Sequence, residues 1–362
     1  MEKRNLVLAF YLPQFHSIPE NDEWWGTGFT EWTNVAKASP LFNGHYQPIK
    51  PGELGYYNLL DINVHHKQGE LAKEHLIDGF CYYHYWFGNE KKLLEKPIEL
   101  VRNTKEWNFK YCLCWANETW SGVWHGAPGK ILQRQLYPGK KDIIAHLKYL
   151  IHFFEDKRYI RYLDKPLMLI HRIKPFLSNP SYIEMYHDLL WKEFKIEVSL
   201  IAGYADYDHH YHKVSEVFVG KASSVFKESI EKFRKESKIK FFLKRLGIDF
   251  YKKPLIIKYD YIRDAMIEKY QESRGTFPVV VPNWDDTPRV GKEESIILKD
   301  HTAESFKKVL EVALNNKIRN RNIVFIKSWN EWGEGNYLEP DSRFGDNFLK
   351  ATKETISKFA QK

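Results

Sequence analysis

The sequence predicts an α/β protein, a (β/α)8 TIM barrel, from two observations. Eight short apolar stretches have the length and composition of buried strands, and segments with helical spacing lie between them. Strands that alternate with helices form parallel βαβ units, and eight units suffice to close a barrel. Polar and aromatic residues also follow most predicted strands, which would gather them in one basin at the carboxyl end of the barrel. A doubly wound sheet, the alternative, would collect them at one switch point.

The predicted strands are the eight apolar runs. They are Leu6–Tyr11, Gly79–Tyr85, Lys110–Trp115, Pro166–Ile170, Val198–Tyr204, Glu216–Val219, Phe277–Val281 and Ile323–Ser328. The charged start followed by Leu6–Tyr11 mimics a short signal peptide. However, Pro13 and His16 follow with no small-residue cleavage site, so we predict that this run is the first strand.

Helices are predicted between the strands from residues that are typical of helix N-termini, either as the N-cap or in the first turn. These residues are Pro97, Asp142, Ser181, Thr302 and Asp346. Glu184 stands three residues after Ser181, which predicts a capping box at that helix. No linker or internal repeat interrupts the pattern, so one catalytic domain is expected over residues 1–362.

A pair of glutamates follows the last predicted strand, in the segment Ser328–Gly335. Glu331 and Glu334 are three residues apart, so strand pleating would send them to opposite faces. They can share a pocket only if the chain leaves the strand near Asn330. In a helical turn, side chains at this spacing lie about 5–6 Å apart at Cβ, close to the carboxyl separation of retaining glycosidases. The pair therefore predicts catalysis on glycosidic bonds, with a surface or capping turn as the plain alternative.

The other candidate site residues stand where predicted strands end. The candidate substrate-binding residues are Tyr11, His84, Tyr85, Trp86, Trp115, Asn117, Glu118, Trp120, Trp284, Asp285, Trp329 and Asn330. Trp124 and Asp286 are further candidates, as a sugar platform and a hydroxyl ligand. Aromatic rings stack on sugars, but they also fill cores, and a carboxylate such as Glu118 can equally form a loop salt bridge.

The composition limits the cellular setting. The chain has 362 residues, 16% of them aromatic, and its longest apolar runs are shorter than the roughly 18 residues that a membrane span requires. Its three cysteines include Cys112 and Cys114 on one face of a predicted strand. Free thiols of this kind suggest a reducing compartment. A cytoplasmic location is expected.

The positive charge is concentrated in one region, residues 221–274. This region carries 15 lysines and arginines against 8 aspartates and glutamates, while the whole chain has a net charge of +8. The rest is nearly neutral, so nucleic acid is not an expected partner. We interpret the region as an insertion between strands six and seven. Its centre, Lys232–Arg245, is either a peripheral contact to the inner membrane or a solvated helix.

Three motifs resemble those of a known family. They are Trp115–Trp120, Pro282–Asp286 and Trp329–Gly335, and they resemble the WbsX family of glycosyltransferases, which belong to O-antigen and surface-polysaccharide gene clusters. The resemblance covers almost the whole chain. That family is similar to endo-α-mannosidases and endo-mannanases, which are (β/α)8 barrels.

The resemblance implies a retaining reaction through a 1,2-anhydro-sugar intermediate. Glu331 would deprotonate the substrate's 2-hydroxyl, and Glu334 would be the general acid and base. Gly333 departs from the endo-α-mannosidase pattern, which has a histidine there. The implied role is α-glycosidic bond cleavage or transfer in lipopolysaccharide and surface-polysaccharide metabolism, on an oligosaccharide or polysaccharide that is free or lipid-linked. No metal or other cofactor is implied.

Two other functions remain open from the residues. Asp206-Tyr207-Asp208 is an Asp-x-Asp motif, which would suit a metal-dependent nucleotide-sugar glycosyltransferase. His209, His210 and His212 form a weaker metal-site candidate. A non-catalytic carbohydrate-binding protein could use the same aromatic residues, but it would not need two clustered glutamates. The sequence specifies neither the sugar and its linkage nor the acceptor.

Overall fold

The computed structural model describes residues 5–122, 130–177, 179–203, 218–223, 225–236, 254–272, 276–292, 295–316 and 323–360. Several sequence predictions fall outside these ranges. They are the Asp-x-Asp motif, the three histidines that follow it, Trp124, and the basic stretch after Glu236. In the described part, no helix is long and apolar enough to cross a membrane.

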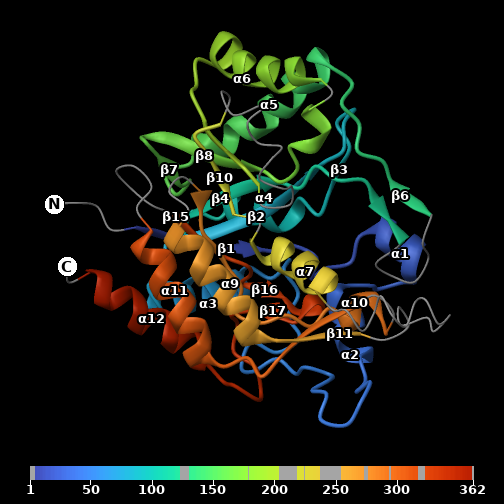
Figure 1. Cartoon of the computed structure of the whole chain (residues 1–362). Helices are drawn as coiled ribbons and strands as arrows, with labels where there is room; N and C mark the ends of the chain where they lie inside the picture. Colours follow the sequence, from blue (N-terminus) through green and yellow to red (C-terminus); the bar gives the residue numbers. More distant parts are fainter. Residues whose placement is uncertain are drawn as a thin grey trace.

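A parallel barrel forms the centre of the molecule (Figure 1). Its neighbouring strands run in the order β12, β10, β9, β8, β4, β2, β1, β15 and β13. Their bounds are Thr276–Phe277, Gly220–Ala222, Ser199–Ala202, Lys165–Ile170, Tyr111–Trp115, Gly79–Trp86, Leu6–Tyr11, Ile323–Ile326 and Val279–Val280. Strands β12 and β13 are separated only by Pro278, and they pair with β10 and β15 at the two ends of the order. This one segment therefore closes the barrel, and the (β/α)8 prediction is confirmed.

The strand sequences explain why this sheet forms. Every residue of β1, β2, β4 and β15 is buried, as expected for parallel strands that are covered on both faces. Seven of the eight predicted runs overlap barrel strands. The sixth was wrong, since the strand is Gly220–Ala222 rather than Glu216–Val219. The buried Lys221 interrupts the apolar pattern there, and the run before it looked more like a strand.

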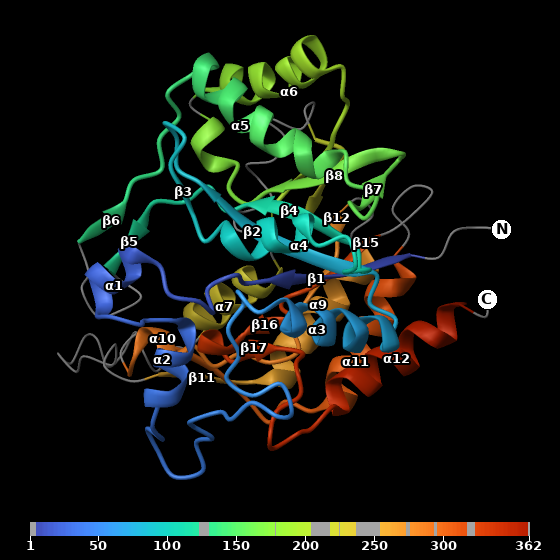
Figure 2. The same cartoon turned by 180° about the vertical axis from the view of Figure 1, so that it is seen from behind.

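Helices cover the outside of the barrel (Figures 1 and 2). They are α3 (Ile62–Glu74), α4 (Lys96–Asn103), α5 (Lys140–Phe154), α6 (Pro180–Phe194), α7 (Val225–Glu236), α9 (Tyr259–Glu272), α11 (Ala303–Asn315) and α12 (Asn347–Ala360). Pro97 lies in the first turn of α4, and the Thr302 side chain caps α11 by accepting from the Ser305 amide at 3.1 Å, both as predicted. Asp346 directly precedes α12.

Two predicted helix starts were wrong. Helix α5 begins at Lys140 with Gly139 as its N-cap, so Asp142 lies inside the first turn. Its carboxylate accepts from the Trp86 indole at 3.2 Å instead. Helix α6 begins at Pro180 after Asn179, so the capping box at Ser181 does not form. In α6 the proline at the first helical position sets the start, one residue before Ser181.

Short elements surround the carboxyl end of the barrel. They are α1 (Pro19–Trp25), α2 (Glu31–Lys37), β5 (Trp120–Ser121), β6 (Ile131–Gln133), β11 (Leu255–Lys258), α10 (Thr287–Val290), β14 (Ile296–Lys299), β16 (Asn330–Glu331), the 3-10 helix η6 (Trp332–Glu334) and β17 (Asn336–Tyr337). Three further short elements are β3 (Lys92–Leu93), β7 (Arg161–Tyr162) and the 3-10 helix η2 (Lys174–Phe176). The expected insertion at residues 221–274 begins inside β10 and includes α7 and α9, so its first boundary was placed too early.

Candidate active site

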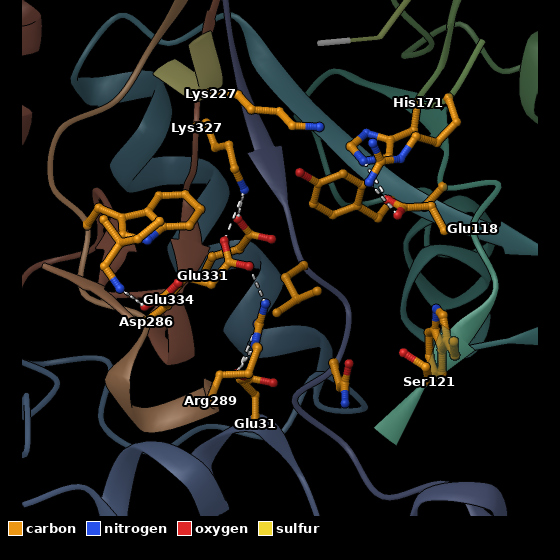
Figure 3. A pocket seen from close by; sticks show the side chains of 18 of the residues that line it. Glu31, Glu118, Ser121, His171, Lys227, Asp286, Arg289, Lys327, Glu331 and Glu334 are labelled. Atoms are coloured by element: carbon orange, nitrogen blue, oxygen red, sulfur yellow. Dashed lines mark hydrogen bonds and ion pairs between the residues drawn. The ribbon is translucent and has the colours of Figure 1, made fainter. Parts of the chain in front are cut away.

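The glutamate pair lies where the chain leaves β15. The strand ends at Ile326, and a short strand and a 3-10 turn follow, ending at Gly335 with a φ of 54°. This departure from the strand is what the spacing of Glu331 and Glu334 required. Both carboxylates project into one cavity at the carboxyl end of the barrel (Figure 3).

Lys327 connects the two glutamates. Its ammonium contacts Glu331 Oε2 and lies 3.1 Å from Glu334 Oε2. Ser328 Oγ also donates to Glu331 Oε2, at 2.9 Å. All three charged side chains are buried, so these contacts take place where solvent screens little.

A second cation, Arg289 of α10, holds the other side of the pair. Its Nη1 lies 2.6 Å from Glu334 Oε1. Its Nε and Nη2 donate to Glu31 Oε1 at 3.0 and 2.9 Å. Glu31 is the first residue of α2 and is 1% exposed. The contacting group is therefore three buried carboxylates and two cations.

The surroundings shift the pKa values of the two glutamates in opposite directions. Burial and the neighbouring Glu334 carboxylate raise the pKa of Glu331. Although burial opposes it, the charges of Lys327 and Arg289 lower the pKa of Glu334 to about 2. Three carboxylates with two cations have one negative charge in excess, and burial raises the pKa of Glu31 as well as that of Glu331. Within the pair, Glu331 therefore takes up a proton more readily than Glu334. This order is opposite to the roles that the family resemblance implies.

The cavity around the pair has a volume of about 460 Å³ and is rich in aromatic side chains. On one wall Trp284 packs on Phe226 at a ring distance of 4.7 Å, with the Lys327 ammonium 5.1 Å from the Trp284 ring centre. On another wall Trp120 packs edge-on against Tyr85 at 5.0 Å. Asp286 also lines the cavity, and burial raises its pKa to about 7.

A second charged cluster lies across the cavity from the glutamate pair (Figure 3). Glu118 pairs with His171 Nε2 at 2.8 Å and with Arg172 Nη2 at 2.7 Å. Although burial works the other way on both groups, these partners hold the pKa of Glu118 well below its usual range, and Glu118 raises the pKa of His171 to about 9. Contacts with Cys81 and His171 outweigh burial at Cys114 and lower the pKa of its thiol to about 6.

The structure brings six of these fourteen predicted site residues together. Those that line the cavity are Tyr85, Glu118, Trp120, Trp284, Glu331 and Glu334. Those that do not line it are Tyr11, His84, Trp86, Trp115, Asn117, Asp285, Trp329 and Asn330. The expectation that this second group contacts a substrate needs correction.

Strand alternation explains several of these corrections. In β2 the Tyr85 side chain faces the cavity, so its neighbours His84 and Trp86 face helix α5. There His84 Nε2 lies 2.8 Å from His146 Nε2, and the Trp86 ring stacks on His146 at 4.5 Å. Trp115 points the same way, since its indole donates to the Trp86 carbonyl at 2.9 Å.

The remaining corrections concern residues that hold the backbone or core together. The Tyr11 hydroxyl donates to Gln68 of α3, Asn117 binds the backbone of Arg172, and Asn330 binds that of Leu12. Asp285 accepts from His45 and Gln47, at 2.8 Å each. Trp329 is fully buried against Phe80. A polar or aromatic residue after a strand can thus stabilise the loop itself.

Comparisons with known proteins identify the family. The family model described as Glycosyltransferase WbsX matches residues 7–352. The chain belongs to the WbsX glycosyltransferase family. It is 32% identical over 356 residues to uncharacterized protein WxcX of Xanthomonas campestris pv. campestris, in each of two strains. That match covers 97% of this chain and 50% of each relative, so the chain spans about half the length of the curated relatives it matches.

Solved structures share the fold of this WbsX family member. A GH99 endo-alpha-mannosidase from Bacteroides thetaiotaomicron has a TM-score of 0.57 and 13% identity, with 98% of this chain and 97% of that chain covered. A glycoside hydrolase-like protein has a TM-score of 0.58 and 13% identity, with 98% and 95% covered. Family membership classes the chain with carbohydrate-active enzymes, and these structures show the same barrel.

Sequence reasoning missed four residues of the site in this WbsX protein. Lys327 directly follows β15. The search for polar residues after predicted strands, which found the glutamates, could therefore also have found Lys327. His171 directly follows β8, so the same reasoning could have found it. Glu31 and Arg289 gave no signal, since they stand 258 positions apart and meet only in the fold. In the described part of the chain, no cluster of three or more metal-ligating side chains forms.

Proposed function

We propose that this protein acts on α-glycosidic bonds of surface-polysaccharide glycans, with retention of configuration, using Glu331 and Glu334 as its catalytic residues. The observation that carries the proposal is the pair itself: two buried carboxylates in one cavity, with pKa values shifted in opposite directions. Acid–base catalysis at a glycosidic bond needs one carboxyl to protonate the leaving oxygen and another to act as base or nucleophile. The aromatic walls would stack on sugar rings.

Two assignments of roles are consistent with this proposal. The family resemblance makes Glu331 the base and Glu334 the acid. The ligand-free electrostatics favour the reverse, because Lys327 and Arg289 stabilise the ionised form of Glu334. Under the first assignment a bound sugar would have to separate Glu334 from its cations and transfer the shared proton to it. Under the second, the raised pKa of Glu331 already favours the protonated form that a general acid needs.

A product analysis tests the proposal directly. The protein would be incubated with oligosaccharides that contain mannose, fucose or N-acetylhexosamine, and the products followed by mass spectrometry and by NMR of the new anomeric centre. We expect cleavage or transfer with retained configuration, and no such product from a Glu331→Gln, Glu334→Gln double variant. Inversion, or an unchanged double variant, would reject the proposed mechanism.

A second candidate is a metal-dependent transferase that uses a nucleotide sugar. The family description, a glycosyltransferase, favours transfer to a sugar acceptor. The same product analysis with and without EDTA separates the candidates, because the glutamate mechanism needs no metal. Activity that requires a nucleotide sugar, is lost with EDTA and returns with Mn²⁺ would favour the transferase. Binding without turnover, unaffected in the double variant, would indicate a carbohydrate-binding protein.

A lipid-linked glycan is the form of substrate that we propose for a cytoplasmic protein of this kind. Helix α7, which opens the basic region, brings Lys227 and Arg234 to the cavity wall. The basic stretch Lys232–Arg245 continues from this helix in the sequence, which would suit anionic lipid headgroups. Sedimentation with anionic vesicles that weakens steeply with salt would support membrane contact. Binding that survives replacement of Lys238, Lys240, Lys244 and Arg245 by glutamate would exclude it.

A further inference from the structure

Glu31 fills the space that a side chain at position 333 would occupy. A Cβ atom on Gly333 would lie 1.7 Å from Glu31 Oε1 and 2.8 Å from its carboxyl carbon. The carboxylate cannot simply move aside, because two nitrogens of Arg289 hold Oε1 in place. Arg289 in turn contacts Glu334. Glycine at position 333 and the carboxylate of Glu31 therefore depend on each other, although they come from opposite ends of the sequence.

The other carboxylate oxygen of Glu31, Oε2, is not bound by Arg289. Both contacts from Arg289 end on Oε1, and within the described residues no hydrogen bond reaches Oε2. Glu31 nevertheless lines the cavity, and Figure 3 shows it beside Arg289, below the glutamate pair. Oε2 is not one of the enclosed side-chain atoms that lack a partner, so it is accessible from the cavity. The cavity thus presents a hydrogen-bond acceptor that has no donor within the described residues, next to Glu334.

We infer that Glu31 is a substrate-binding residue whose Oε2 accepts hydrogen bonds from hydroxyl groups of the sugar at the reaction centre. Gly333 is then a specificity-determining residue, because only glycine leaves room for this carboxylate. The inference rests on the proposed function, since it places a sugar ring beside Glu334. It also limits the substrate class. The group that binds Oε2 must donate a hydrogen, so it is a hydroxyl rather than an ionised carboxylate, phosphate or sulfate.

Glu31→Gln is the most informative variant. Its amide oxygen can keep both hydrogen bonds from Arg289, and its amide nitrogen then faces the cavity, so an acceptor becomes a donor with little change in shape. Gly333→Ala is the second variant, since its methyl group would displace the carboxylate without removing it. Glu23→Gln is the matched control, because Glu23 is exposed on α1 in the same part of the chain. Thermal unfolding shows which variants are folded.

The assay uses the α-glycosyl fluoride that the wild type accepts best and its monodeoxy analogues, each lacking one hydroxyl. If Glu31 binds a hydroxyl, one analogue should lose about 10–100-fold in kcat/KM with the wild type, the range for a hydrogen bond to a charged group. The same analogue should lose far less with Glu31→Gln and with Gly333→Ala, while Glu23→Gln behaves as wild type. Equal losses in all four proteins would overturn the inference and leave the proposed function standing.

A wild type that turns over no fluoride would reject the proposed function, and binding would then decide the inference. The parent sugars and their deoxy analogues would be titrated calorimetrically into the wild type and the folded variants. A deoxy analogue whose loss of affinity disappears in the Glu31 or Gly333 variant supports the inference. The absence of such coupling, or of any sugar binding, overturns it.

Discussion

Two charged clusters face each other across the cavity, and they differ in how their charges balance. Glu118 is one carboxylate with two partners, Arg172 and a His171 whose pKa is raised to about 9, so it stays ionised. On the other side, three carboxylates share the cations Lys327 and Arg289. Only the second cluster has a carboxylate in excess, and there the pKa values of Glu331 and Glu31 are raised. The comparison suggests that the ratio of cations to carboxylates separates a fixed ion pair from a group that can exchange a proton.

The largest expected effect comes from the cluster with excess carboxylate. Glu331→Gln and Glu334→Gln should each lower turnover of a natural oligosaccharide by about 10²–10⁴-fold, the usual contribution of one general catalyst. Glu118→Gln should cost much less in turnover. Initial rates of the three variants measure this. A loss with Glu118→Gln as large as with either glutamate of the pair would show that the catalytic cluster is the wrong one.

The same two variants separate the roles within the pair. A general acid matters most when the leaving group is poor, so its variant should keep much of the first step on a glycosyl fluoride. The base should be needed with both substrates. Selective rescue of Glu334→Gln by the fluoride would support the roles implied by the resemblance, and rescue of Glu331→Gln would support those of the ligand-free electrostatics. Equal losses on both substrates would mean that the glutamates only hold the sugar.

Removal of Lys327 should change the pH dependence of the reaction. Lys327→Met takes away a cation that contacts both glutamates, so the pKa of each carboxyl should rise. The acidic limb of the kcat/KM profile, which reports ionisation of the base, should therefore move to higher pH. We expect the largest loss of activity on this acidic limb, about 10-fold for each unit by which the pKa of the base rises, and a smaller loss at neutral pH. Lys327→Arg should restore part of it, and a profile that does not move would contradict the role of Lys327.

The Glu118 cluster should instead affect stability. Its carboxyl pKa is depressed in the folded state, so its contribution is present above the usual pKa of 4.5 and is lost as the pH falls through the folded value. Because the side chain is 37% exposed, Glu118→Gln should lower the free energy of unfolding by only about 1–2 kcal/mol at pH 7. Urea denaturation at pH 7 and at pH 3 tests this, and the difference from wild type should shrink at the lower pH. A constant difference would mean that lost packing, not charge, causes it.

The sequence was sufficient for features that depend on neighbouring residues. Continuous apolar runs such as Leu6–Tyr11 predicted barrel strands, and the spacing of Glu331 and Glu334 predicted a shared cavity. The position of a residue at the end of a strand was a weaker predictor of substrate contact, because it does not tell which way the side chain points. Tyr85 faces the cavity while His84 and Trp86 face a helix. The pairing of Glu31 with Arg289 could not be predicted, because only the closed barrel brings α2 and α10 together.

The smallest expected effect concerns sugar binding on the Glu118 side. Trp120 follows Glu118 by two residues and packs against Tyr85 and Trp24, at ring distances of 5.0 and 6.1 Å. An aromatic contact of this kind contributes about 0.5–1.5 kcal/mol beyond its buried area, which corresponds to about 2–12-fold in affinity. Trp120→Ala should raise KM for an oligosaccharide by this factor. It should leave turnover of a monosaccharide fluoride nearly unchanged, because that small substrate occupies only the side with excess carboxylate. Steady-state kinetics on both substrates measure the contrast, and a similar loss on the fluoride would show that the two sides of the cavity do not act separately.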